Sequence, residues 1–161
     1  MVLATGSFGF LVALLVRGCG AGGASKELPS SSTLTANNGD RIFLADSRNH
    51  RVCVFGVSPL RFLTSFGQRD SLPLRFKLPY GLAVHACCLY VADSGNKCVH
   101  VLTLHGQFLS SFDVDYRPYG IAVRPDGKLL VESDFGRRVE LMTPFGSLLQ
   151  VRPPHAYESQ I

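Results

Sequence analysis

The feature that most constrains this chain is a segment pattern that occurs three times. Segments with the same order of apolar and polar residues begin at Ile42, Leu89 and Leu129, so the spacing is 47 residues (42 to 89) and then 40 (89 to 129). The second copy reads Leu-Tyr-Val-Ala-Asp-Ser-Gly-Asn-Lys-Cys-Val-His-Val-Leu. A period of this size is typical of architectures in which one supersecondary unit stacks on the next.

Two further segments recur in the same order around this pattern. Pro-Tyr-Gly-Leu-Ala-Val at 79–84 returns at 118–123 with Ile for Leu, and Phe-Leu-Thr-Ser-Phe at 62–66 returns at 108–112 with Ser for Thr. All these segments are short, rich in aromatic and β-branched residues, and bounded by Gly, Pro, Asn or Asp, which is typical of strands. Each unit therefore predicts four strands, which in the second copy are 81–85, 88–92, 98–103 and 107–112.

Four-stranded units at this spacing are typical of propeller blades, and no segment shows a sustained helical period with caps. We therefore predict an all-β fold: a partial, open β-propeller of about three four-stranded blades, over 40–66, 79–112 and 118–151. Closed propellers have 4 to 8 blades, so three blades leave an arc whose ends expose strand edges. We expect these edges to bind a protein partner or a second copy of the chain.

The repeated unit resembles the NHL repeat over residues 40–151. The third copy departs from the signature, with Glu-Ser-Asp at 132–134 in place of Ala-Asp-Ser, and residues 32–37 of the first copy do not resemble a Pro-x-Gly-Leu-Ala-Val strand. NHL propellers often recruit substrates for ubiquitin ligases, whose RING and B-box domains are missing here. The resemblance implies a non-catalytic interaction scaffold or adaptor, in ubiquitin-dependent protein turnover.

The turns between the second and third strands of each repeat are basic. Equivalent turns emerge on one face of a propeller, so we predict a binding face formed by Arg48, His50, Arg51, Lys97, Arg137 and Arg138. One interpretation is a solvated surface, and the other is a groove for single-stranded RNA or an acidic peptide. Tyr80 and Tyr119 are the candidate stacking partners for bases. The net charge of +4 is too small to indicate a DNA partner, and none is predicted.

The sequence shows no spacing typical of catalysis or metal binding. It has neither H-E-x-x-H nor G-x-S-x-G, and its five cysteines include no C-x-x-C pair. We interpret Asp46 and Asp93 as turn residues that accept hydrogen bonds from nearby N–H groups. We predict no enzymatic activity, no cofactor and no metal. A further alternative from the resemblance is a remnant of a lumenal NHL-type lyase, although the ligand set of those enzymes does not match these histidines.

The two ends of the chain differ in composition from the repeats. Residues 1–39 comprise an apolar segment and a Ser/Thr/Gly-rich linker, and 152–161 are predicted to be a flexible tail. The apolar run 8–16 is too short to span a bilayer, so no transmembrane span is predicted. The cytoplasm is the favoured compartment, with secretion or a lumenal location as the alternative if residues 1–24 are a signal peptide.

Overall fold

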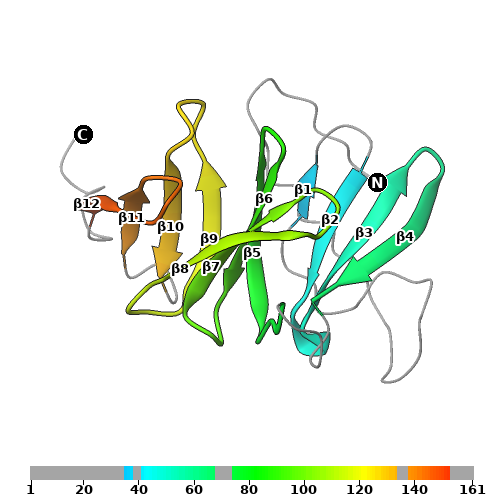
Figure 1. Cartoon of the computed structure of the whole chain (residues 1–161), viewed down its shortest axis with the longest axis horizontal. Helices are drawn as coiled ribbons and strands as arrows, with labels where there is room; N and C mark the ends of the chain where they lie inside the picture. The colour runs from blue at the N-terminus through cyan, green and yellow to red at the C-terminus, as the bar shows by residue number, and fades with distance from the viewer. Residues whose placement is uncertain (1–34, 38–40, 68–73, 134–137, 153–161) are drawn as a thin grey trace, which may run out of the picture.

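The computed structural model describes residues 35–37, 41–67, 74–133 and 138–152. The predictions for a signal peptide in residues 1–24 and for a flexible tail after 152 fall outside these ranges. The described residues form three four-stranded antiparallel sheets (Figure 1). Within them, no helix is both long and apolar enough to cross a membrane.

Each sheet is a meander in which strands adjacent in the sequence are adjacent in the sheet. The first contains β1 (Thr35–Asn37), β2 (Arg41–Asp46), β3 (Arg51–Val57) and β4 (Leu60–Phe66), with a 3₁₀ turn at Ser47–Asn49 between β2 and β3. The second contains β5 (Pro79–His85), β6 (Cys88–Asp93), β7 (Cys98–Thr103) and β8 (Phe108–Asp113). The third contains β9 (Pro118–Val123), β10 (Leu129–Ser133), β11 (Val139–Met142) and β12 (Leu148–Arg152). We call these sheets the first, second and third blade.

The first blade begins earlier in the chain than the repeat pattern indicates. Strand β1 lies inside the range predicted to be linker, and it pairs with β2 in a register that sets Thr35 opposite Leu44. This is also the place where no Pro-x-Gly-Leu-Ala-Val motif was found. An edge strand pairs through main-chain N–H and C=O groups, so it can form where the sequence motif is missing.

The three blades stack through alternating faces of their strands. Successive side chains of a strand point to opposite faces of its sheet, and β6 shows this directly. Leu89 and Val91 pack in one core with residues of the first blade, including Phe43 and Val54. The intervening Tyr90 and Ala92 join a second core with the third blade, which contributes Ile121, Leu129, Val131 and Met142. The second blade is therefore buried on both faces.

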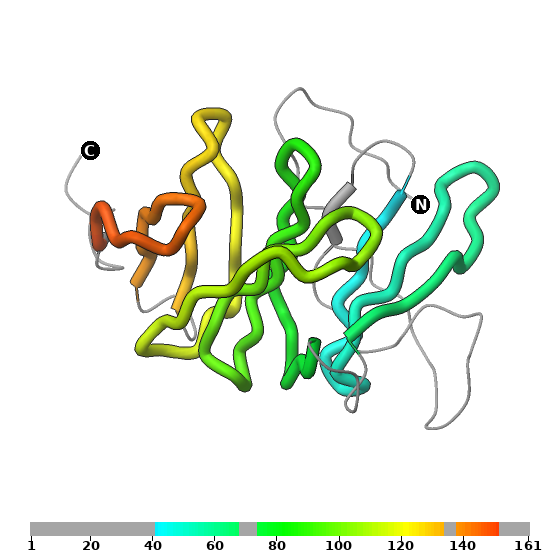
Figure 2. The backbone as a smooth tube through the Cα atoms, in the orientation of Figure 1, coloured from blue at the N-terminus to red at the C-terminus, as the bar shows by residue number. Residues whose placement is uncertain are grey.

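The blades form an arc that does not close. The innermost strands of successive blades lie next to each other, with contacts from β1 to β5 and from β5 to β9. The first and third blades stand at opposite ends of the molecule, with the second blade between them (Figure 2). These observations confirm the predicted fold class, an open all-β arc of three propeller-like blades.

Candidate functional site

A set of three polar positions recurs at the turn between the second and third strands of each blade. The first position ends the second strand, and the other two lie at or immediately before the start of the third strand, two residues apart and on the same face. We call each set a polar triplet. The triplets are Asp46, Arg51 and Cys53 in the first blade, Asp93, Cys98 and His100 in the second, and Ser133, Arg138 and Glu140 in the third.

In the first blade, a buried carboxylate is paired with an arginine. Arg51 Nε donates to Asp46 Oδ2 over 2.8 Å, and Asn49 Nδ2 donates to both carboxylate oxygens over 3.0 and 2.9 Å. Burial lowers the pKa of Arg51, but the hydrogen bond to Asp46 together with the charges of Cys53 and Asp46 raises that pKa above its ordinary value. Arg51 is therefore charged but paired within the fold, and Asp46 neutralises the positive charge that a ligand would need.

In the third blade, the arginine of the triplet is also paired. Arg138 Nε lies 3.2 Å from Glu140 Oε1, its Nη2 bonds to Asp115, and its guanidinium lies 4.5 Å from the ring centroid of Tyr116. The Tyr116 hydroxyl donates to Glu140 Oε2 over 2.7 Å. Burial and this hydrogen bond raise the pKa of Tyr116. Arg138 faces two carboxylates, Asp115 and Glu140, so its positive charge is fully neutralised and the cluster carries no surplus of positive charge.

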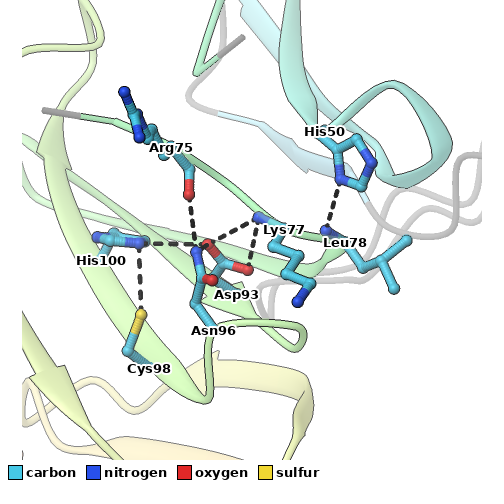
Figure 3. A network of polar contacts seen from close by, with 8 residues as sticks. All are labelled: His50, Arg75, Lys77, Leu78, Asp93, Asn96, Cys98 and His100. Atoms are coloured by element: carbon cyan, nitrogen blue, oxygen red, sulfur yellow. Dashed lines mark hydrogen bonds and ion pairs between the residues drawn. The ribbon is translucent and has the colours of Figure 1, made fainter. Parts of the chain in front are cut away.

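The triplet of the second blade has no arginine. His100 Nε2 lies 3.3 Å from Asp93 Oδ2 and 3.3 Å from Cys98 Sγ (Figure 3). The ligand atoms of all three residues lie within 4.8 Å of one another, and all three residues are buried. His100 Nδ1 is also buried, and among the described residues it has no hydrogen-bond partner.

The second-blade carboxylate is held in place by the chain that enters this blade. Lys77 donates its backbone N–H to Asp93 Oδ1 and Oδ2 over 2.9 and 3.1 Å, and Asn96 Nδ2 donates to Oδ2 over 2.8 Å. Asn96 also donates to the carbonyl of Arg75 over 2.7 Å. A cavity of about 290 Å³ adjoins this network and is lined by His50, Arg75, Phe76, Lys77 and Asn96.

Sequence reasoning predicted no metal site and missed this cluster, because it searched for known motif spacings. One feature of the sequence could have indicated the cluster. Cys98 and His100 are two residues apart in β7, so their side chains lie on the same face of the strand. The third member comes from strand pairing, since Asp93 lies directly opposite Cys98 in the register of β6 and β7. That register becomes visible only when the hairpin is assembled.

The predicted binding face is only partly available to a ligand. Arg48 and Lys97 are exposed, whereas Arg51 and Arg138 are paired with carboxylates as described above. His50 Nδ1 accepts the backbone N–H of Leu78 over 3.1 Å. Arg137 lies outside the described residues. The basic residues at these turns are evident from the sequence, but the carboxylates that neutralise them, Asp46, Asp115 and Glu140, are identified only by the fold.

The two tyrosines expected to stack with bases stack with each other. The ring centroids of Tyr80 and Tyr119 are 4.5 Å apart, with an angle of 26° between the ring planes. One face of each ring is therefore already covered.

The free cysteines allow a test of burial in the first blade. Burial raises the pKa of the Cys53 thiol to about 11, and the charge of Arg51 offsets this only in part. Its thiolate fraction near pH 8 is then about a hundredfold smaller than for a thiol with the ordinary pKa. We expect a thiol reagent to modify the exposed Cys87 rapidly and Cys53 only after unfolding. Peptide mapping after timed labelling identifies the sites. Equal rates at Cys53 and Cys87 in the folded chain would contradict the burial described here.

Comparison with known proteins supports both the repeat and the fold. The NHL repeat model matches residues 32–55, which include β1 and β2. The chain therefore carries an NHL repeat, and the match begins before the boundary predicted from the sequence. No curated protein sequence matches the chain.

Solved structures with a similar arrangement are propeller-like proteins. Kuenenia stuttgartiensis hydrazine synthase has a TM-score of 0.62 and 18% identity, over 83% of this chain and 39% of that chain. The catalytically inactive virginiamycin B lyase from Staphylococcus aureus with quinupristin has a TM-score of 0.62 and 16% identity, over 82% and 45%. Myxococcus xanthus glutaminyl cyclase has a TM-score of 0.56 and 13% identity, over 73% and 50%. The matched part spans half or less of each neighbour, and the likeness at these identities shows the fold alone.

Proposed function

We propose that this chain is a non-catalytic protein-interaction module that binds its partner through the end face of the third blade. The observation that carries this proposal is a comparison of equivalent positions in two blades. In the second blade, Tyr90, Val101 and Ala83 are buried, with 5%, 6% and 8% of their surface exposed. Their counterparts in the third blade are half-buried Leu130, half-buried Leu141 and exposed Ala122.

The opposite end of the arc does not offer the same kind of surface. On the first-blade face that points away from the second blade, Leu44, Cys53 and Phe55 form a buried cluster. The end face of the third blade is therefore the better candidate for a docking surface. It presents Leu130, Leu141 and Ala122 beside one charged residue, Glu132. Covering its apolar part would remove apolar area from water at about 25 cal/mol per Å². A second copy of the chain is the first partner to test, because the same face can pair with itself about a two-fold axis.

The alternatives have less support from the described residues. RNA binding needs free cations and open aromatic faces, and here two arginines of the predicted face are paired while the two tyrosines stack on each other. A role as an adaptor in ubiquitin-dependent turnover stays a prediction from the resemblance, since it depends on which protein binds. The lyase alternative has the fold likeness as its support, and a fold does not determine function.

The proposal predicts an assembly that depends on the end face of the third blade. Light scattering during gel filtration of the full chain should give a mass above that of a monomer, and the double variant Leu130→Glu/Leu141→Glu should reduce it to a monomer. Glutamate on a buried apolar face leaves a charge without a partner, which strongly disfavours association. The matched control is Leu148→Glu/Leu149→Glu on the exposed outer strand β12, which should leave the mass unchanged.

Two results would argue against this proposal. One is an assembly that the Leu130→Glu/Leu141→Glu variant leaves intact. The other is a folded monomer that binds no hydrophobic dye. A monomer whose dye binding is lost in this variant would support the same surface and indicate a different protein as its partner.

A further inference from the structure

We propose that Asp93, Cys98 and His100 form a zinc site in the second blade. One carboxylate oxygen, one thiolate sulfur and one imidazole nitrogen are ligands that Zn²⁺ accepts together. Three protein ligands leave the fourth tetrahedral position to water or to another small ligand. The three residues come from the end of β6 and the start of β7 and are all buried.

Two of the three distances between the ligand atoms fit a tetrahedral ion, and the third, between Asp93 and Cys98, is within 4.8 Å. Zinc–ligand distances of about 2.0 to 2.3 Å at tetrahedral angles place neighbouring ligand atoms about 3.3 to 3.5 Å apart. His100 Nε2 is 3.3 Å from both Asp93 Oδ2 and Cys98 Sγ. These residues therefore need little movement to accept an ion. With the metal on Nε2, the imidazole proton sits on Nδ1.

Comparison of the blades explains why a cation suits this position. In the first blade, the guanidinium of Arg51 balances the charge of buried Asp46, and in the third, Arg138 balances Glu140. In the second blade, the position of these arginines is occupied by Cys98, while the aspartate stays fully buried. A buried carboxylate without a balancing charge is costly. A zinc ion held by the thiolate and the imidazole would supply the positive charge that arginine supplies elsewhere.

The groups around the Asp93 carboxylate hold it in a fixed orientation, as is usual for a carboxylate that binds a metal. The Lys77 N–H and the Asn96 amide both donate to Asp93, and both residues also line the cavity of about 290 Å³ (Figure 3). All three ligands belong to the β6–β7 hairpin, and Asp93 is hydrogen-bonded to the segment that leads into the second blade.

Cobalt(II) is the probe of choice, because a tetrahedral Co²⁺–thiolate site is coloured and Zn²⁺ displaces it. The full-length chain, purified with a chelator and a reductant, should bind one Co²⁺ with visible d–d bands and a thiolate-to-cobalt charge-transfer band. Zn²⁺ should abolish the spectrum and raise the Tm by several degrees, because the ion binds the folded state. Cys98→Ser and His100→Gln should each weaken binding by more than about a hundredfold, since losing even an outer partner costs about ten- to a hundredfold.

The matched control is Cys53→Ser. This residue is a buried free cysteine at the position in the first blade that corresponds to His100. It should keep the spectrum unchanged. The wild-type chain tests the proposal even if the variants do not fold: no charge-transfer band at one equivalent of Co²⁺ would overturn it. A spectrum that survives in folded Cys98→Ser would place the bound metal elsewhere and would also overturn it.

Discussion

Replacing Gly81 by alanine is expected to destabilise this chain by about 3 kcal/mol, at the upper end of what overpacking usually costs. A Cβ at this position in β5 would lie 2.5 Å from the carbonyl oxygen of Tyr119 and 2.9 Å from the amide nitrogen of Ile121. Both atoms belong to the main chain of β9, so no side-chain rotation can relieve the clash. The second and third blades would have to separate where their innermost strands meet. Urea denaturation followed by circular dichroism measures the effect.

Gly56→Ala is the control for this experiment. Gly56 is also a strand glycine, but a Cβ there would first meet a side-chain carbon of Leu63 at 3.6 Å, an ordinary contact. We expect this variant to be neutral or slightly stabilising, because alanine reduces the freedom of the unfolded chain. Similar unfolding midpoints for Gly81→Ala and Gly56→Ala would mean that the blades are not in close contact at Gly81.

The contrast between these glycines shows which parts of the fold the sequence could predict. The strands and their order follow from local signals, namely alternating apolar residues and turn residues that recur in three copies. The close approach of β5 to β9 is a contact between repeats. The glycine of the repeated Pro-Tyr-Gly motif can therefore be recognised in the sequence. Its role, which is to let β5 approach the main chain of β9, is seen only when the blades are stacked.

The same distinction applies to the candidate sites. The basic residues near these turns were recognisable in the sequence, and the partners of their arginines were not. Asp46 is near Arg51 in the chain and accepts its hydrogen bond across the turn, whereas Asp115 reaches Arg138 from the segment before the third blade. The cluster around His100 needed the register of two strands. The charge balance of these turns and the geometry of the cluster depend on which side chains meet in the fold. The residue types in the sequence do not specify those partners.

Breaking the ion pair of the first blade is expected to have an effect at least as large as that of Gly81→Ala. Asp46 is completely buried, and the side chain of Arg51 is 18% exposed. Asp46→Asn or Arg51→Met leaves one buried charge without its partner, which typically costs about 3 to 5 kcal/mol. This is a large part of the total stability of about 5 to 15 kcal/mol of an ordinary domain. In the double variant, neither charge is left alone, so the loss should be smaller than the sum of the two single losses.

Lys128→Met is the matched control, because Lys128 forms a similar ion pair with Asp126 in which both partners are exposed. It should change stability little, since solvent screens such pairs. The result for Arg51 also bears on function. If Arg51→Met unfolds in the same way as Asp46→Asn, the arginine is a structural partner of a buried carboxylate, and the basic face loses one of its predicted ligand-binding groups. If Arg51→Met keeps the wild-type stability while Asp46→Asn does not, the guanidinium is free to bind a ligand, and RNA or an acidic peptide becomes the partner to test first.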